Sequence, residues 1–136
     1  MPLSNSEYET LAAFRFRLRR FLNFSEQAAA AVGITQQQYQ ALLAVRAHEG
    51  PEPLTISELA ERMQIRHHSA VGMVDRLEQQ AMVRRAHLES DRRKVGIHLT
   101  PGGRRVFEKL ASVHRAELRR IGPDFGRFMR HFAGPV

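Results

Sequence analysis

The fold is decided by residues 54–100, which read LTISELAERMQIRHHSAVGMVDRLEQQAMVRRAHLESDRRKVGIHLT. In the first part of this stretch, apolar residues recur at intervals of three and four, which is the pattern of an amphipathic helix. The apolar positions are Ile56, Leu59, Ala60 and Met63. We predict that Ser57 caps this helix, because a serine oxygen can accept a hydrogen bond from a free N–H group of the first turn. The pattern breaks near residues 64–66, which predicts a turn.

A second amphipathic helix is predicted after the turn. Its apolar stripe is formed by Ala70, Val71, Val74 and Leu77. Its other face carries small, polar or basic residues, namely His67, His68, Ser69, Gly72, Met73 and Arg76. Such a face is typical of a helix that lies in the DNA major groove and reaches base edges with its N-terminal residues. Pairs of short amphipathic helices are also common as ordinary surface structure, so the two helices alone leave both interpretations open.

The next segment predicts a two-stranded hairpin. Residues 82–88 and 94–99 alternate in the manner of half-buried strands, and the polar sequence ESDRR at residues 89–93 separates them. A hairpin directly after a helix-turn-helix is a wing. An arginine at a wing tip can enter the narrow minor groove, where the negative potential is enhanced. A nearby aspartate can orient its guanidinium through paired hydrogen bonds, so the hairpin favours the DNA-binding interpretation.

These residues carry a resemblance to a known family. Residues 54–110 resemble the winged helix of the MarR family of bacterial transcriptional regulators. The matching features are ISELAERM, the helix ending VDRLEQQAMV, the tip SDRRKVGIHLT with the family's Asp91-x-Arg93 spacing, and TPGG at the start of the next helix. The order of elements also matches across nearly the full chain. The chain departs from the family at Ala81, where a glycine usually ends the recognition helix, so we expect a different helix end there. The two histidines at residues 67 and 68 are an unusual start to a recognition helix, so the resemblance implies no operator sequence.

The resemblance implies a mainly α (α+β) fold, a winged helix-turn-helix with flanking N- and C-terminal dimerisation helices. Residues 1–34 would form the N-terminal dimerisation helix, residues 35–100 the DNA-binding domain and residues 101–136 the C-terminal dimerisation helices. The expected activity is that of a homodimeric regulator, as a rule a repressor, of a pseudo-palindromic double-stranded DNA operator. Two alternatives stay open: a winged-helix module that bridges DNA without sequence preference, and one that binds another protein.

The expected DNA contacts follow the same pattern. Arg76 is the candidate for a guanine contact, and Arg93 is expected in the minor groove with Asp91 orienting it. The remaining residues expected on the recognition face are Arg66, His67, His68, Ser69, Gly72 and Met73. Contacts to phosphates are expected from Arg84, Arg85, Arg92 and Lys94. The two histidines are also interpretable as solvated residues.

Composition narrows the class of protein. The 136 residues predict one domain that is large enough for a hydrophobic core. The net charge of +7 implies a polyanionic partner, and residues 62–94 alone carry +4, so we expect most of the excess on the DNA-reading surface. No apolar run is long enough to cross a bilayer and no signal peptide opens the chain, which predicts a cytoplasmic protein. The absence of cysteine excludes disulfides, cysteine–zinc sites and the cysteine-based peroxide sensing of some MarR relatives.

Helices are predicted on both sides of the winged helix. We expect them at residues 7–31, 36–48, 104–120 and 124–131, with Thr35 and Gln38 forming a capping box and Gly122-Pro123 separating the last two. Residues 49–53 predict a turn, and Leu54-Thr55 a short third strand beside the wing. The first and last helices hold more apolar surface than a small winged helix can cover. This favours a homodimer over packing of these helices on their own domain alone.

Other kinds of site have little support. There are seven histidines but no HExxH motif, and only His114 and Glu117 share a helical i, i+3 spacing, so we expect no metal and no cofactor. No motif positions or activates a nucleophile, so catalysis is not expected. The resemblance implies a small aromatic or anionic effector between the dimerisation helices and the winged helix. By position alone, its pocket would be lined by Phe14, Arg17, Tyr39, Arg46 and Phe107, which are equally interpretable as core and surface.

Overall fold

The computed structural model describes residues 1–48 and 50–133, and it confirms the mainly α class. The described elements are α1 (Asn5–Ala31), α2 (Gln36–Ala47), α3 (Ile56–Met63), α4 (His67–Gln79), β1 (Val83–His87), β2 (Val95–Leu99) and α5 (Pro101–Ala133). Glu49 of the predicted turn and residues 134–136 of the predicted C-terminal unit lie outside the described residues. Within the described ranges, no helix combines the length and the apolar character needed to cross a membrane.

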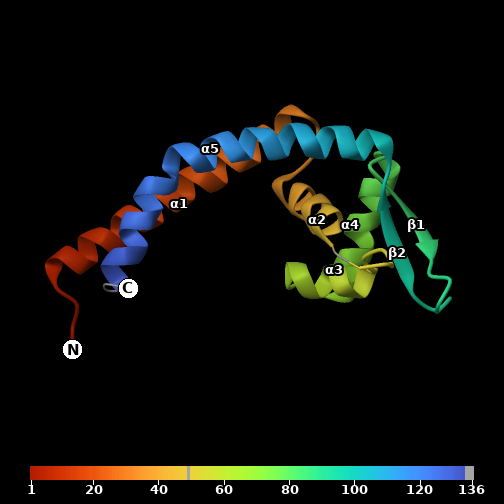
Figure 1. Ribbon diagram of the computed structural model, residues 1–136, viewed down its shortest axis with the longest axis horizontal. Coiled ribbons are helices and arrows are strands. Elements are labelled where there is room, and N and C mark those ends of the chain that lie inside the picture. The colour runs from red at the N-terminus through yellow and green to blue at the C-terminus, as the bar shows by residue number, and fades with distance from the viewer. Residues whose placement is uncertain (49, 134–136) are drawn as a thin grey trace.

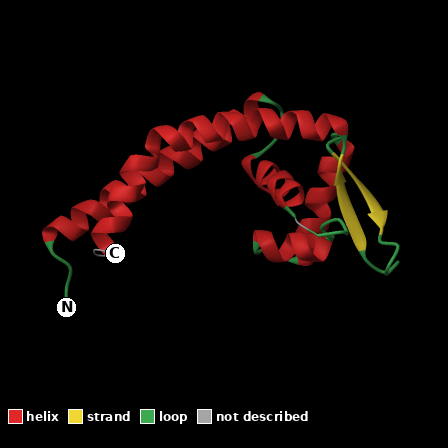
Figure 2. Cartoon of the chain, viewed as in Figure 1, coloured by secondary structure: helices red, strands yellow, loops and turns green. Residues whose placement is uncertain are grey.

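Two layers make up the shape in Figure 1. Helices α1 and α5 run side by side in opposite directions as one long, curved arm, with both chain ends near its tip. Helices α2, α3 and α4 and the small sheet lie under the first part of α5 (Figure 2). The core between them contains fully buried side chains from each of these elements, including Leu42, Leu59, Val74, Leu77, Ile97 and Leu110. The wing and the recognition helix therefore share one core with the base of the arm.

Capping boxes set the start of the first three helices. Ser4 with Glu7 opens α1, Thr35 with Gln38 opens α2 as predicted, and Thr55 with Glu58 opens α3. The prediction that Ser57 caps α3 is wrong. The hydroxyl of Thr55 accepts from the Glu58 N–H at 3.1 Å, and the Glu58 carboxylate accepts from the Thr55 N–H at 3.0 Å, so α3 begins one residue before Ser57.

The predicted break at Gly122-Pro123 is also wrong, because α5 continues to Ala133. Side chains beyond the proline are held on α1: the Phe14 ring meets the ring of Phe125 edge to face at 5.6 Å, and Arg17 forms an ion pair with Asp124 at 3.3 Å. Pro123 itself lies on the exposed side of the arm, where water can bind the carbonyl that its missing N–H leaves free. Tertiary contacts therefore override the local signal.

Ala81 ends the recognition helix in the way that a glycine would. Its φ is +60°, in the left-handed region, and the Met82 N–H donates to the Leu77 carbonyl at 2.9 Å. This is the hydrogen bond of a Schellman motif, so the expectation of a different helix end is wrong. The chain then enters β1, which pairs with β2 in antiparallel register from Val83–Leu99 to His87–Val95. The predicted third strand is present as a single bridge between Thr55 and Gly96.

Candidate nucleic-acid interface

The N-terminus of α4 is free on the surface. Arg66 is its N-cap residue and makes no side-chain capping bond, and Arg66, His67, His68 and Ser69 are all exposed. The first N–H groups of the helix therefore have no side-chain acceptor at the cap. Free N–H groups and the positive end of the helix dipole favour a phosphate at this position.

Arg76 lies on the same exposed face, about two turns beyond Ser69. A Cβ atom placed on Gly72 would lie 3.6 Å from Nη1 of Arg76, so the guanidinium folds back over the glycine. Since Gly72 has no side chain, nothing protrudes from the helix at the middle of this face. The only long basic side chain there is that of Arg76. Such a face allows close approach of the backbone to base edges, with one guanidinium available for a paired contact.

Met73 does not belong to this face. Only 5% of its surface is exposed, and it packs in the core with Ala70, Val74 and Leu77. The prediction that Met73 faces the groove is wrong, because its spacing of three from Ala70 and four from Leu77 places it on the apolar stripe.

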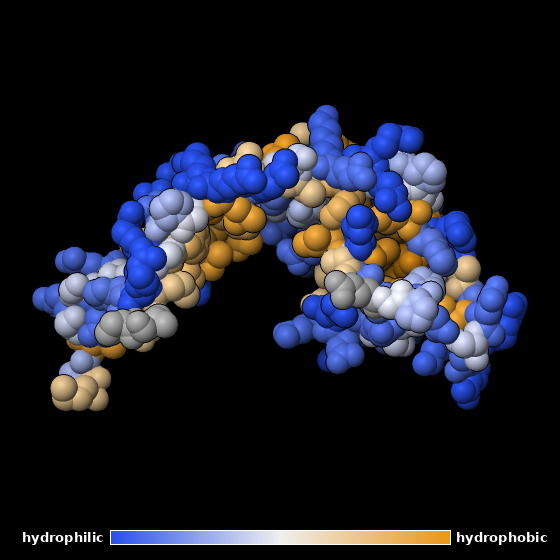
Figure 3. All heavy atoms as spheres, viewed as in Figure 1, coloured by the Kyte–Doolittle hydropathy of each residue, from blue (hydrophilic) through white to orange (hydrophobic). Residues whose placement is uncertain are grey.

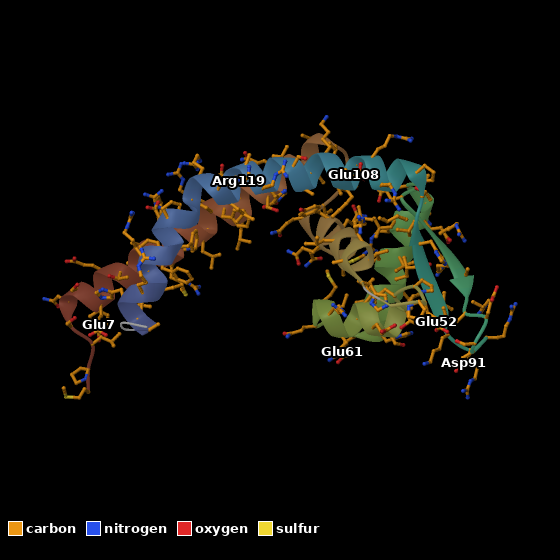
Figure 4. All side chains as sticks on the ribbon, in the orientation of Figure 1. Glu7, Glu52, Glu61, Asp91, Glu108 and Arg119 are labelled. Carbon is orange, nitrogen blue, oxygen red and sulfur yellow. The ribbon has the colours of Figure 1, made fainter. Side chains whose placement is uncertain are left out.

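The wing tip holds Arg93 in the predicted arrangement. The Asp91 carboxylate accepts hydrogen bonds from the backbone N–H, Nε and Nη2 of Arg93 at 3.1, 3.0 and 3.1 Å. These bonds hold the pKa of Asp91 below its usual value and raise the pKa of Arg93. The side chain of Arg93 is nevertheless 91% exposed, and that of Asp91 only 25%. Asp91, labelled at the tip of the wing in Figure 4, therefore orients a guanidinium that remains free to meet a partner.

Arg85 makes ion pairs that the sequence did not predict. Its guanidinium forms ion pairs with Asp75 at 2.7 Å and Glu78 at 3.1 Å, and its backbone N–H donates to Glu78 at 3.1 Å. Both acids belong to α4, so Arg85 ties the first wing strand to the recognition helix. The two carboxylates neutralise this side chain in the structure, and a phosphate contact from Arg85 stays a prediction.

Three other basic residues of the wing are exposed, but they lie in two places. Arg92 and Lys94 are at the tip beside Arg93. Arg84 is opposite His98 in the strand register, near the root of the wing and seven residues before Asp91. Side chains of adjacent strand residues point to opposite faces, so Arg84 and Arg85 cannot share a surface. The structure therefore brings Arg92 and Lys94 to Arg93, and places Arg84 apart from them.

The wing and the helix-turn-helix enclose a hollow of about 940 Å³. His67 and Val71 of α4, Arg85 of β1 and Arg93 of the tip all contribute to its wall. The recognition helix and the wing tip thus border one continuous concave surface. Hydrophilic atoms dominate the wing tip in Figure 3. The arrangement can place a helix end, a single guanidinium and a wing arginine against one polyanionic partner.

His114 and Glu117, the pair with helical spacing, do not form a metal site. His114 is 5% exposed; its Nδ1–H donates to the Leu110 carbonyl at 2.8 Å and its Nε2 lies 2.7 Å from the Ser25 hydroxyl. Glu117 instead pairs with Arg120. In the part of the chain that is described, no group of three or more His, Asp or Glu side chains is placed to hold a metal ion. His114 is a buried link between α1 and α5, which the sequence pattern did not reveal.

The five residues considered for an effector pocket do not meet in one place. The rings of Tyr39 and Phe107 stack at 6.0 Å in the core, whereas Phe14 contacts Phe125. Phe107 and Phe125 are eighteen residues apart on α5, or about 27 Å along the helix. This set therefore describes core and surface positions rather than the walls of one cavity.

Comparisons with known proteins agree with this geometry. Residues 32–94 match the family model described as "MarR family". A curated relative, the HTH-type transcriptional repressor MdtR of Bacillus subtilis (strain 168), is 34% identical over 88 residues, which cover 65% of this chain and 55% of that protein. The chain spans about half the length of the curated relatives it matches.

Solved structures match over more of the chain. AbsC, a MarR family transcriptional regulator from Streptomyces coelicolor, superposes with a TM-score of 0.72 at 28% identity, covering 92% of this chain and 84% of that one. MepR of S. aureus in its complex with DNA has the same fold, with a TM-score of 0.69 at 21% identity over 88% of this chain and 82% of that one. The wing signature, the recognition helix and the flanking helices thus match those of MarR family regulators, and residues 32–94 match the family's model.

Proposed function

We propose that this protein is a sequence-specific DNA-binding transcriptional regulator, and that it acts as a repressor. The observation that carries the proposal is the wing tip, where Asp91 orients an arginine that is itself 91% exposed. An oriented, solvated guanidinium beside an uncapped helix end fits a DNA duplex better than it fits a protein core. A repressor of Bacillus subtilis is among the relatives, which supports the sign of regulation.

The active form in this proposal is a homodimer. Large apolar side chains are exposed along both helices of the arm: Leu11, Phe16 and Leu22 on α1, and Val113, Leu118, Met129 and Phe132 on α5. In Figure 3 an apolar strip runs along the underside of the arm. Apolar patches of this kind mark interaction sites, and a second copy offers the matching helices. Two recognition helices would then enter successive major grooves about 34–36 Å apart on a pseudo-palindromic operator, in the cytoplasm.

Release of the operator by a small aromatic or anionic effector is part of the proposal. Such a ligand must bind the DNA-competent and the released arrangements with different affinities, since equal affinity would shift nothing. In the proposed dimer the arms of the two subunits pack together, so a change in their packing would alter the spacing of the two winged helices.

Substitution of the two arginines tests the DNA-binding surface. Arg93→Ala should weaken operator binding and reduce the slope of log K against log salt by roughly one unit, because one groove-inserted charge is lost. Arg76→Ala should instead relax sequence preference at one position of each half-site, at a cost of about 1–3 kcal/mol. Fluorescence anisotropy across a salt series measures both effects, with the exposed Arg62 of α3, changed to Ala, as a control. Unchanged affinity and slope in Arg93→Ala would remove the wing from the model.

Non-specific DNA bridging is the second candidate, and one observation favours it. Helix α5 carries eight Arg or Lys residues against three acidic residues, so much of the net charge of +7 lies on the arm rather than on the wing. A basic surface on the arm would attract any duplex. In that case unrelated duplexes would compete equally with the operator.

A further inference from the structure

A second hollow, of about 390 Å³, lies at the root of the wing. Four elements line it: the end of α2, both wing strands and the first turn of α5. Its charged side chains are mostly cationic, with Arg46, Arg84 and Arg104 on its wall and Glu52 as the single acidic residue among the described lining. Segments far apart in the sequence thus bring three guanidinium groups to one place.

These three arginines lack the partners that other arginines of the chain have. Within the described residues, no side-chain hydrogen bond or ion pair involves Arg46, Arg84 or Arg104, whereas Arg85, on the neighbouring strand position, is held by two carboxylates. Like charges gathered around a concave wall repel one another, and low-dielectric walls focus their field. A bound anion would relieve this repulsion.

Two histidines in the same wall add hydrogen-bonding groups. His98 lies opposite Arg84 in the strand register, and its partial burial, followed by the nearby charge of Arg84, lowers the pKa of its imidazole. The Nδ1 atom of His48 is buried and has no hydrogen-bond partner among the described residues. Buried polar atoms are nearly always paired, so an orphaned nitrogen at this wall is consistent with a site for a polar ligand.

We propose that the hollow formed by Arg46, Arg84, His98 and Arg104 binds a small polyanion that carries carboxylate or phosphate groups. Guanidinium groups bind both kinds of oxyanion through paired hydrogen bonds, and three of them match a ligand with two or more anionic groups. Proline side chains at residues 51 and 53 complete the wall and give it an apolar rim. This hollow shares residues 48 and 50–53 with the wall of the larger hollow, but its arginines are different: Arg84 lies at the root of the wing, whereas Arg93 lies at its tip.

The test titrates the full chain, without DNA, with citrate and with inorganic phosphate at constant ionic strength. Backbone amide shifts in ¹⁵N NMR should change in a saturable manner around residues 46, 84, 98 and 104. Arg46→Gln and Arg104→Gln should each weaken binding by about three- to tenfold, because each removes one charge-assisted contact. Arg105→Gln is the matched control, since it removes the same charge in the same turn of α5 but does not line the hollow. Thermal melting confirms that each variant is folded.

The other source of an oxyanion for this hollow is a phosphate group of DNA. If neither citrate nor phosphate saturates, but Arg104→Gln lowers the salt slope of duplex binding by about one unit and Arg105→Gln does not, the bound phosphate belongs to DNA. The proposal is overturned if the small anions fail to saturate and the slope is unchanged. It is also overturned if Arg105→Gln weakens anion binding as much as Arg104→Gln, because the effect would then be general screening.

Discussion

Ala81 adopts a backbone conformation that disfavours any side chain. Its φ of +60° lies in the left-handed region, where a Cβ atom crowds the following carbonyl. Ala81→Gly should therefore raise the free energy of unfolding by about 0.5–1 kcal/mol, the strain relieved less the added freedom of the unfolded chain. Urea denaturation measures the change. The exposed Ala116 within α5 is the control, because Ala116→Gly should lower stability by about 1 kcal/mol. A loss of stability in Ala81→Gly would contradict this explanation of the helix end.

Asp91 gives the wing tip a defined response to acid. The hydrogen bonds from Arg93 lower the pKa of Asp91, so their contribution is present above the usual carboxyl range and is lost as pH falls through the lowered pKa. The Nε–H resonance of Arg93 should stay constant between pH 7 and about pH 5 and move only below about pH 4. Asp91→Asn should remove that transition. A shift of this resonance between pH 5 and 7 would show that another group controls the tip.

Residue positions were predictable where a spacing rule applied. The spacing of three and four residues along one helix face places Met73 in the core, and the prediction that it faces the groove did not follow this spacing. The pairing of Asp91 with Arg93 is local and followed from the sequence. The partners of Arg85 lie seven and ten residues away on another element, so only the packing of α4 against β1 reveals them.

At the scale of elements, the ion pairs of Arg85 join the first wing strand to the recognition helix. Arg85→Ala should increase amide hydrogen exchange in β1 and β2 and weaken operator binding, because the wing would no longer be tied to Asp75 and Glu78. The loss of global stability should be small, about 0.5–1 kcal/mol, since these side chains are about one third or more exposed. Arg92→Ala, at an exposed tip position, is the control and should leave exchange in the strands unchanged. Equal exchange in both variants would show that the strands hold their position without Arg85.

Elements themselves were predictable within a few residues, with two informative failures. The sequence contains the capping-box pattern Thr55-x-x-Glu58, which is a stronger start signal than Ser57 alone. The proline at residue 123 is a strong local stop signal, but the contacts of Phe125 and Phe128 with Phe14 hold the helix together beyond it. Those contacts join residues more than a hundred positions apart, so local propensity could not include them.

At the scale of the whole molecule, positive charge lies in two places. The sequence predicted most of the positive excess on the DNA-reading surface, because residues 62–94 carry +4. Helix α5 adds a second basic surface, with eight basic against three acidic residues. Within residues 62–94, Arg85 is paired with Asp75 and Glu78, two acids already subtracted in the value of +4. In the proposed mode of binding, the DNA-reading surface depends on a few oriented groups rather than on total charge. The property that follows is a preference for particular DNA sequences.

Selection of binding sites from random duplex DNA, at near-physiological salt, tests this property most directly. We predict enrichment of an inverted repeat whose half-sites are one helical turn apart, about 10–10.5 base pairs between centres, because two recognition helices of a dimer would read it. Arg76→Ala should return a motif degenerate at one position of each half-site. Salt-sensitive binding without enrichment of any motif would contradict the account, and would identify the wing and the arm as general polyanion-binding surfaces.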